Sequence, residues 1–254
     1  MPQQPRISIS IVSHGQGALV KNLLSDLSTH CATPLEVILT INIGENLPFS
    51  AADFGFPIRV VKNAAIKGFG ANHNAAFRHV KAPFFCVLNP DIRLENDPFP
   101  VLLGALDDVG IGVAAPKRLS PGGKIEDSAR RFPAPLFILK KTLGMARKLD
   151  YEIGDVPVRP EWVAGMFMLF RSEIFQKLCG FDERYFLYYE DVDLCLRLRR
   201  LGYDVLLMPQ ASAVHDARRQ SHRSIRYLLW HASSLLRFLY RRQRYKQARG
   251  LTPG

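Results

Sequence analysis

The segment Asn89-Pro90-Asp91 has the residue types and the spacing of a small cation site. It directly follows the apolar run Phe84–Leu88, which predicts a buried strand. A carboxylate and an amide oxygen on a tight turn can reach one hard cation, and that cation can hold the oxygens of a diphosphate. Asn-Pro-Asp is also favoured turn chemistry. Spacing alone therefore favours a simple turn, and the cation site is a hypothesis.

A second group of acids stands at the start of a predicted helix over residues 190–201. The positive end of a helix dipole keeps a carboxylate ionised, as a general base must be. The alternative is plain helix capping, with an ion pair between Asp193 and Arg197 four residues apart. Aromatic residues just before the helix favour a partly dry pocket for a sugar. The acids are Glu190, Asp191 and Asp193, and the aromatic residues are Phe186, Tyr188 and Tyr189.

Other polar residues lie at predicted strand ends, where ligands bind in open α/β sheets. Ser13 and His14 end the first strand, and Asn42 ends the second. His215 follows a strand over 205–208, although a lone histidine more often has a structural role. The segment 68–70 resembles a phosphate loop only weakly, because it lacks the third glycine of a dinucleotide fingerprint and the Lys-Ser/Thr of a P-loop.

The elements that position these residues follow from the hydrophobic pattern. Apolar runs predict strands over 7–12, 35–41, 58–61 and 84–88, and helical spacing predicts helices over 19–27 and 68–80. The second half is less regular, with a strand over 162–170, a strand over 205–208 that ends at Pro209, and loop residues from Pro116 to Pro135. The alternation of strands and helices predicts a mostly parallel α/β sheet with helices on both faces.

Composition adds one strong asymmetry. The chain has 254 residues, 47% of them hydrophobic, which suits one large domain with a real core. Its net charge of +11 lies almost entirely in the segment from Ala217 to the end, which has nine Arg, one Lys and no acidic residue. A nucleic-acid binder spreads basic residues over a groove. The localised charge instead favours an anionic surface as the partner, and no nucleic acid.

The same C-terminal segment predicts an amphipathic helix from about Ser221. Its apolar residues follow helical spacing, with arginines largely on the other side and Tyr227 and Trp230 near the boundary, a pattern typical of an interfacial helix. The alternative is that the apolar face packs on the catalytic domain and the arginines are solvated. The apolar residues are Ile225, Leu228, Leu229, Ala232, Leu235, Leu236 and Leu239.

Cysteine usage and the N-terminus bear on the compartment. The four cysteines form no C-x-x-C pair, and we expect them to be small buried residues in a reducing compartment. The N-terminus lacks the apolar core of a signal peptide, and no run reaches the ~18 apolar residues of a spanning helix. We therefore expect a cytoplasmic protein, peripheral on the cytoplasmic face of the inner membrane.

Taken in order, these segments resemble the family-2 inverting glycosyltransferases of the GT-A fold, especially the bacterial rhamnosyltransferase-like branch. The resemblance covers roughly residues 7 to 240. Each motif alone is weak, and the ordered set is specific. The matching segments are 9–14, 67–74, 87–91, 162–169, 180–183, 186–195 and 214–215.

The resemblance implies an α/β GT-A fold with a Rossmann-like, nucleotide-binding, mostly parallel sheet. It implies a catalytic domain over 1–216, with a nucleotide-binding part to about 115 and an acceptor and catalytic part over 116–216. Residues 217–254 would form the basic amphipathic helical tail. Asp191 takes the place of the catalytic base, with Glu190 beside it. Asp91 takes the place of the metal-contacting acid of a D-x-D motif, supported by His215 and Asn89.

The remaining roles implied by the resemblance concern the substrates. The cation would be Mg²⁺ or Mn²⁺, and a histidine ligand tilts the choice slightly towards Mn²⁺. Asn89 is a weaker ligand than the usual acid, and Ile41 stands where relatives have the Asp that contacts the base. The donor residues would be Ser13, His14, Asn42, Lys67, Gly68, Asn72, Asn89 and Asp91, and the acceptor residues Trp162, Gly165, Tyr188 and Tyr189.

The function implied is transfer of a sugar, specifically rhamnose from dTDP-rhamnose or a sugar from a UDP donor. The acceptor would be a glycan or a polyprenyl-linked sugar in cell-envelope polysaccharide synthesis. Two alternatives remain open. A non-catalytic nucleotide-sugar or polysaccharide-binding protein on the same scaffold would have no need of both Asp91 and Asp191. A sugar nucleotidyltransferase would need a basic Gly-rich loop after the first strand, and residues 13–17 contain no Lys or Arg.

Overall fold

A single mixed sheet organises the chain in the computed structural model, which describes residues 4–134, 149–216 and 225–250. The eight strands lie in the order β3-β2-β1-β4-β9-β6-β10-β5. Four neighbouring pairs are parallel and three are antiparallel, so the mostly parallel sheet is confirmed. The strands are β1 (Ile7–Ser13), β2 (Leu35–Ile41), β3 (Ile58–Lys62), β4 (Phe84–Leu88), β5 (Ile92–Arg93), β6 (Ile111–Leu119), β9 (Phe167–Arg171) and β10 (Asp204–His215).

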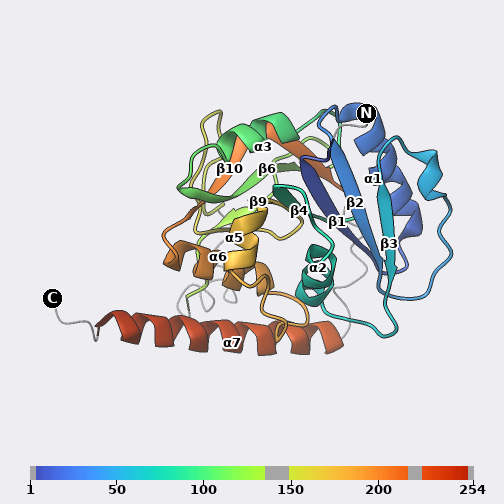
Figure 1. The fold of residues 1–254 in the computed structure, drawn as a ribbon. Helices are drawn as coiled ribbons and strands as arrows, with labels where there is room; N and C mark the ends of the chain where they lie inside the picture. The colour runs from blue at the N-terminus through green and yellow to red at the C-terminus, as the bar shows by residue number, and fades with distance from the viewer. Residues whose placement is uncertain (1–3, 135–148, 217–224, 251–254) are drawn as a thin grey trace.

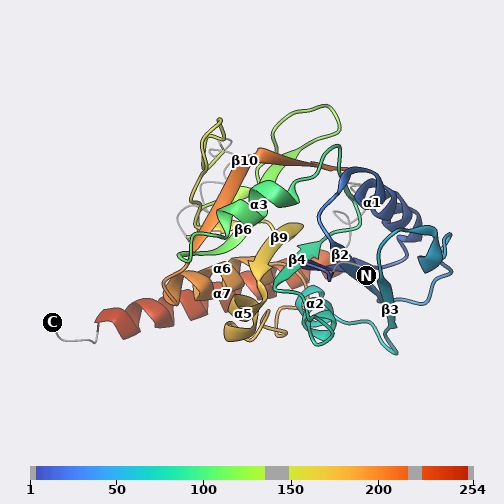
Figure 2. The ribbon, with the colours of Figure 1, turned by 45° about the horizontal axis from the view of Figure 1, so that its top comes forward.

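Helices cover both faces of this sheet (Figures 1 and 2). On one face α1 (Gly17–His30) and α3 (Phe99–Ala105) share a core cluster with the sheet. The other face carries α2 (Phe69–Phe77), α5 (Ser172–Lys177) and α6 (Glu190–Arg200). The long helix α7 (Ile225–Gly250) runs along the base of the molecule in Figure 1, on the side of α2, α5 and α6. A short helical turn, η1 (Ala51–Asp53), and a small sheet of β7 (Ala129–Arg130) and β8 (Trp162–Val163) complete the fold.

Alternation along the strands explains why two cores form. In β4, Cys86 and Leu88 pack into the cluster under α1, while Phe85 and Val87 pack into the cluster under α6. Successive side chains of a strand point to opposite faces, so a continuous apolar run is buried on both sides. This is why β1, β2 and β4 were predictable from their composition.

Two predicted strand boundaries at prolines are wrong. A loop was expected to begin at Pro116, but β6 continues through Pro116 to Leu119. Strand β9 pairs with β6 only at Val113 and Ala114, so beyond Ala114 that side of β6 has no ladder for a proline to interrupt. The strand expected to end at Pro209 continues to His215, and its register shifts between Met208 and Ser212. A bulge is one of the few places where a sheet accepts proline.

Three further expectations need correction. The strand predicted over 162–170 is broken into β8 and β9 by a turn at Gly165. The helix α3 was not predicted. Of the four cysteines expected to be buried, Cys179 is exposed, in the turn after α5, and Cys31 is half-buried.

The helix expected from about Ser221 is described from Ile225 onwards, and Ser221 itself lies outside the described residues. The division of the chain at residue 216 stays a prediction. Within the described ranges, no helix combines the length and the hydropathy that crossing a membrane requires.

Candidate active site

Asp191 is held at the start of α6 by two backbone N–H groups. The N–H of Gly165 donates to Oδ2 at 2.9 Å, and the N–H of Val192 donates to Oδ1 at 2.8 Å. Burial raises the pKa of the Asp191 carboxyl above its ordinary value, although these two hydrogen bonds and Arg130 act in the opposite direction. A carboxyl fixed in place with a raised pKa has the properties of a general base.

The two neighbouring acids differ from Asp191. Glu190 is buried, its Oε2 has no hydrogen-bond partner, and burial together with the charge of Asp191 raises its pKa well above the ordinary value. Its surroundings therefore favour the protonated form more than solvent does. Asp193 is fully buried and pairs with Arg197 at 2.8 Å and with Arg241 of α7. The predicted ion pair with Arg197 is thus confirmed, but it lies in the interior rather than on the helix surface.

The backbone before Asp191 is strained. Tyr188 and Tyr189 have φ values of 70° and 67°, a left-handed conformation that non-glycine residues rarely adopt. Such residues persist only where the surroundings enforce them, and they cluster at functional sites. Here the rings of both tyrosines lie 5.2–5.4 Å from the ring of His231 on α7. Helix α7 therefore helps to fix the turn that presents Asp191.

The turn 164–166 joins Asp191 to the segment 89–91. Gly165 donates to Asp191, and the carbonyl of Met166 accepts a hydrogen bond of 2.8 Å from the N–H of Asn89. Two adjacent residues thus link the ends of β4 and the start of α6. Since one residue spans at most ~3.6 Å, two residues and these two hydrogen bonds place the N–H of Asn89 within roughly 13 Å of the Asp191 carboxyl.

Asp91 and His215 meet because β10 pairs with β5. The antiparallel register places His215 opposite Ile92, and Nε2 of His215 lies 3.3 Å from Oδ2 of Asp91. The other ring nitrogen, Nδ1, lies 3.2 Å from Glu126. Burial alone would lower the pKa of His215, but the hydrogen bond and the charge of Asp91, together with the hydrogen bond to Glu126, outweigh burial and raise the pKa. Oδ1 of Asp91 is buried without a hydrogen-bond partner.

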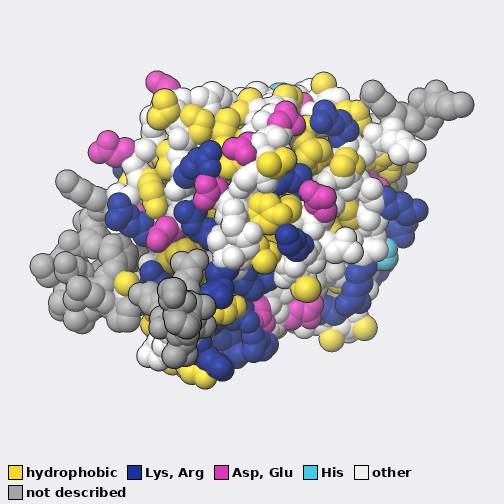
Figure 3. All heavy atoms as spheres, turned by 60° about the vertical axis from the view of Figure 1, so that its left-hand side comes forward, with side chains coloured by type: hydrophobic (Ala, Val, Ile, Leu, Met, Phe, Trp, Pro, Cys, Tyr) yellow, Lys and Arg dark blue, Asp and Glu magenta, His cyan; other side chains and the backbone are white. Residues whose placement is uncertain are grey.

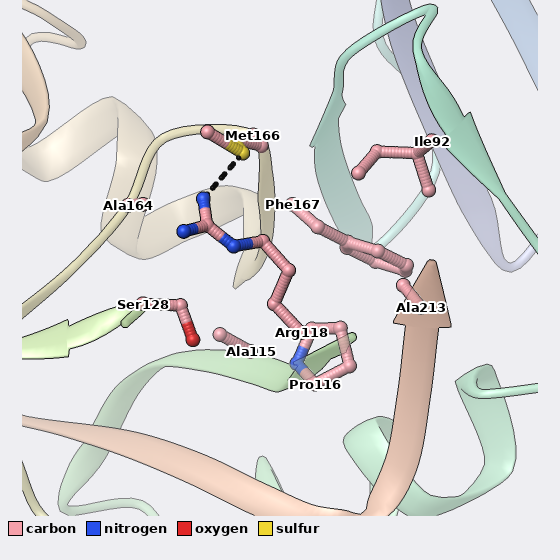
Figure 4. Close-up of a pocket in the computed structure, with 9 residues that line it drawn as sticks. All are labelled: Ile92, Ala115, Pro116, Arg118, Ser128, Ala164, Met166, Phe167 and Ala213. Atoms are coloured by element: carbon pink, nitrogen blue, oxygen red, sulfur yellow. Dashed lines mark hydrogen bonds between the residues drawn. The ribbon is translucent and has the colours of Figure 1, made fainter. Parts of the chain in front are cut away.

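A hairpin that sequence reasoning missed supplies two more charged residues. Backbone bonds close it around the turn 121–123, and they place Arg118 opposite Glu126. Nε of Arg118 lies 3.0 Å from Glu126, and the guanidinium donates to the sulfur of Met166. Figure 4 shows Arg118 reaching towards Met166 across a small pocket. The Pro-Gly-Gly turn, interpreted as a hairpin with alternating residues, was the signal that could have revealed this pair.

The donor residues proposed from the first two strands form an amide network. Asn42 donates to His14 and to the carbonyl of Lys67, and its oxygen accepts from the N–H of Lys67 and from Asn63. All four hydrogen-bonding positions of the Asn42 amide are thus used. Asn72 donates to the carbonyls of Lys67 and Gly68. Both amides therefore fix the loop 67–68, while His14 is exposed and Ser13 is buried beneath it.

Gly68 is needed for a close approach. A Cβ atom there would lie 2.5 Å from the carbonyl oxygen of Phe186, and the next residue, Phe69, donates to that same oxygen. The loop 67–68 is thus tied to the aromatic segment that leads to Asp191. Close packing against Phe186 is therefore enough to require glycine at position 68, and no bound phosphate is needed to explain it. This agrees with the weak resemblance of residues 68–70 to a phosphate loop.

Trp162 is buried and donates through Nε1 to the carbonyl of Arg131, at 2.9 Å. The guanidinium of Arg130 lies over its ring, 5.4 Å from the centroid. Arg130 is also one of the charges that lower the pKa of Asp191. Trp162 therefore supports Arg130 beside the base, and Arg130 is a further site residue that the sequence interpretation did not name.

Comparison with known proteins identifies the family. A family profile described as Glycosyltransferase like family 2 matches residues 5–233. The chain belongs to this family. It is 29% identical to the rhamnosyltransferase WbbL of Escherichia coli K12, over 93% of this chain and 94% of that protein. It is 26% identical to an N-acetylglucosaminyl-diphospho-decaprenol L-rhamnosyltransferase of Mycobacterium tuberculosis, over 82% of this chain and 75% of that protein.

Solved glycosyltransferases share the fold of this family-2 chain. The similarity to GalNAc-T7 with UDP, GalNAc and Mn²⁺ has a TM-score of 0.66 at 15% identity and covers 85% of this chain. The similarity to the mannosyltransferase PcManGT of Pyrobaculum calidifontis with GDP-Man and Mn²⁺ has a TM-score of 0.62 at 14% identity and covers 87%. The chain spans 44% and 59% of those two chains. The GT-A fold expected from the sequence is confirmed.

The acidic residues of this family-2 chain fit a divalent cation in part. The described residues contain no group of three or more His, Cys, Asp or Glu side chains arranged around one point. The pair of Asp91 and His215 nevertheless offers an unpartnered buried carboxylate oxygen next to an imidazole nitrogen. Glu126 on the far ring nitrogen orients the imidazole, as outer-shell carboxylates do for metal-ligating histidines. Substrate oxygens would have to complete the coordination.

Gly165 gives the first test of this geometry. A Cβ atom there would lie 3.2 Å from Cβ and 3.4 Å from Oδ2 of Asp191, so Gly165→Ala must displace the carboxyl by a few tenths of an ångström. We expect turnover to fall about tenfold with little change in KM for the donor, because misplaced catalytic groups cost rate rather than binding. Gly154→Ala is the matched control, since a Cβ there meets nothing within 4 Å. Unchanged turnover in Gly165→Ala would contradict a catalytic position for Asp191.

Proposed function

We propose that this chain is an inverting glycosyltransferase that moves L-rhamnose from dTDP-rhamnose to a polyprenyl-linked or glycan acceptor in cell-envelope polysaccharide synthesis. One observation supports the reaction type: Asp191, a fixed carboxyl with a raised pKa, is connected through the turn 164–166 to the segment 89–91, where Asp91 meets His215. The names of two relatives support rhamnose as the sugar. The family match favours transfer over the sugar-binding and nucleotidyltransferase alternatives.

The proposed chemistry is a single displacement. The acceptor hydroxyl attacks the anomeric carbon from the face opposite the nucleoside diphosphate, the bond to the diphosphate breaks, and Asp191 takes the hydroxyl proton. Attack from the opposite face inverts the anomeric centre. The backbone N–H groups of Gly165 and Val192 hold Asp191 in place during the transfer.

The leaving diphosphate needs positive charge. Asp91, His215 and Asn89 would hold Mg²⁺ or Mn²⁺, and such an ion neutralises charge that builds on the diphosphate. The guanidinium of Arg118 interacts electrostatically with Asp91. The protein therefore also supplies a positively charged side chain at this end of the site. The amide network of Asn42 and Asn72 would keep the loop 67–68 in place against the nucleotide.

A screen of nucleotide sugars tests the proposal directly. Release of nucleoside diphosphate is measured with dTDP-rhamnose and with UDP- and GDP-sugars, in Mn²⁺, Mg²⁺ or a chelator. We expect dTDP-rhamnose to give the fastest release and the chelator to remove it. A faster UDP-sugar would overturn the donor while keeping the reaction, and release of pyrophosphate from a sugar phosphate would indicate a nucleotidyltransferase.

The pH profile gives a second test. Burial raises the pKa of Asp191, and a base works only when it is ionised, so kcat/KM should fall as pH decreases through that raised value. We expect the acid limb clearly above pH ~4, the ordinary range for aspartate. Glu190→Gln is the matched control, because it removes the other buried acid of the pair, and the limb should stay if Asp191 is the base. A limb near pH ~4 in the unmodified enzyme would contradict Asp191 as a buried base.

A further inference from the structure

Helix α7 is attached to the body through a narrow face. Phe238 is fully buried, Oγ of Ser234 donates to the carbonyl of Leu187 at 3.0 Å, and Arg241 pairs with Asp182 and Asp193. Trp230 stacks on Phe186 with 4.6 Å between the ring centroids. These residues form the inner face of α7, which packs against the segment that leads into α6 and to Asp191.

The opposite face of α7 carries exposed apolar side chains. Of the eleven large hydrophobic side chains that are exposed in the described part of the chain, five lie on this helix. At about 100° per residue they fall in one sector on the far side from Phe238. We call this sector the outer stripe: Ile225 (77% exposed), Leu228 (69%), Leu229 (63%), Leu236 (68%) and Tyr240 (65%). The alternative in which the apolar face of the helix merely packs on the domain is therefore wrong for these residues.

Positive charge borders the outer stripe. Arg226, Arg237 and Arg244 share one edge of it by the same helical spacing, and the residues of α7 include no acid. Figure 3 shows Lys and Arg side chains gathered along the lower edge of the molecule, at the level of α7. An exposed apolar stripe bordered by arginines has the composition of a helix that lies in a lipid interface.

We propose that the outer stripe docks α7 onto an anionic lipid leaflet, with the helix parallel to the surface. The apolar residues would enter the boundary between headgroups and acyl chains, and the arginines would contact lipid phosphates. A second copy of the chain fits the same stripe less well. Two such helices packed antiparallel through their stripes would bring the arginine-bearing edges of both helices together, with no acid of α7 to neutralise them.

Docking in this orientation has a consequence for the acceptor, which rests on the proposed function. The inner face of α7 contacts the rings of Tyr188 and Tyr189, two of the proposed acceptor residues. One helix would then touch the leaflet on its outside and the acceptor site on its inside. A lipid-linked sugar could reach Asp191 without leaving the membrane.

Vesicle co-sedimentation of the full chain tests the docking. The probes are vesicles of phosphatidylcholine alone and of phosphatidylcholine with increasing phosphatidylglycerol. We expect binding to rise with the anionic fraction and to fall with salt. The variant Leu228→Ser/Leu229→Ser/Leu236→Ser should bind at least ~10-fold more weakly. The variant Arg226→Gln/Arg237→Gln/Arg244→Gln should bind ~10²-fold more weakly to anionic vesicles at low salt.

Matched controls come from equally exposed residues elsewhere. Ile66→Ser/Val109→Ser/Val156→Ser removes three exposed hydrophobic side chains, and Arg59→Gln/Lys62→Gln/Arg78→Gln removes three exposed charges. Both controls should bind vesicles as the unmodified chain does. Equal binding by stripe and control variants would overturn the proposal, as would a dimer in sedimentation equilibrium that the leucine variant dissolves without any vesicle binding.

Donor hydrolysis without vesicles separates this proposal from the proposed function. The leucine variant should retain hydrolysis, because Leu228, Leu229 and Leu236 are exposed on the face of α7 opposite Phe238. Absence of hydrolysis in the unmodified chain would refute the transferase, whereas absence of vesicle binding with normal hydrolysis would refute only the docking.

Discussion

Asp191→Asn is expected to lower turnover by ~10²–10⁴-fold and to leave donor affinity nearly unchanged. The amide keeps the shape of the carboxyl and can still accept one of the two backbone hydrogen bonds, from Gly165 or from Val192. It cannot take a proton from the acceptor. The loss corresponds to about 3–5 kcal/mol of transition-state stabilisation.

The measurement pairs steady-state kinetics with calorimetry of donor binding on the same variant. Glu152→Gln serves as the control, since Glu152 is exposed and its replacement should change turnover little. Near-normal turnover in Asp191→Asn would remove Asp191 from the mechanism. Glu190 would be the next residue to test, because both oxygens of Asp193 are engaged by arginines.

Asp91→Ala is expected to abolish the part of nucleoside diphosphate binding that depends on Mn²⁺. The buried Oδ1 of Asp91 has no partner in the protein, and its removal takes away the one acidic ligand of the proposed cation site. His215→Ala should weaken the metal-dependent binding less, because a substrate oxygen or water can replace one neutral ligand. Calorimetry of dTDP and UDP with and without Mn²⁺ provides the readout, independently of turnover.

The control for the metal test is Asp155→Ala, which removes an exposed carboxylate elsewhere. It should bind the nucleotide as the unmodified chain does. If the unmodified chain binds dTDP equally well in Mn²⁺ and in chelator, the enzyme is metal-independent. The role of neutralising the diphosphate would then pass to Arg118 and Arg130.

Sequence reasoning succeeded where burial alone dictates residue type. The central strands are continuous apolar runs because both faces of the sheet are covered, and α6 shows its acids and its apolar side in plain periodicity. The motif order singled out Asp91, Asp191 and His215, whose roles stay predictions. The antiparallel register of β5 and β10 explains how His215, far away in the chain, comes to lie beside Asp91.

The parts that failed depend on contacts between distant segments. Pro116 and Pro209 look like strand ends, and only the short β9 ladder and the register shift in β10 explain why strands pass through them. The Arg118–Glu126 pair needs the hairpin to be known first. Helix α7 had two possible orientations from its periodicity, and the ion pairs of Arg241 select the one with leucines outward.

Those ion pairs also have a practical consequence for protein production. Asp193, in the first turn of α6, is fully buried and pairs with Arg197 and Arg241. Deleting α7 would remove Arg241 and leave this buried carboxylate paired with Arg197 alone. Breaking a buried ion pair from one side costs about 3–5 kcal/mol, which rivals the net stability of many domains. We therefore expect a chain truncated before α7 to be less stable, whatever solubility it gains. Polar substitutions at Leu228, Leu229 and Leu236 would remove exposed apolar surface from the outer stripe. They would keep the ion pairs of Arg241 at the start of α6, the helix that begins with Asp191.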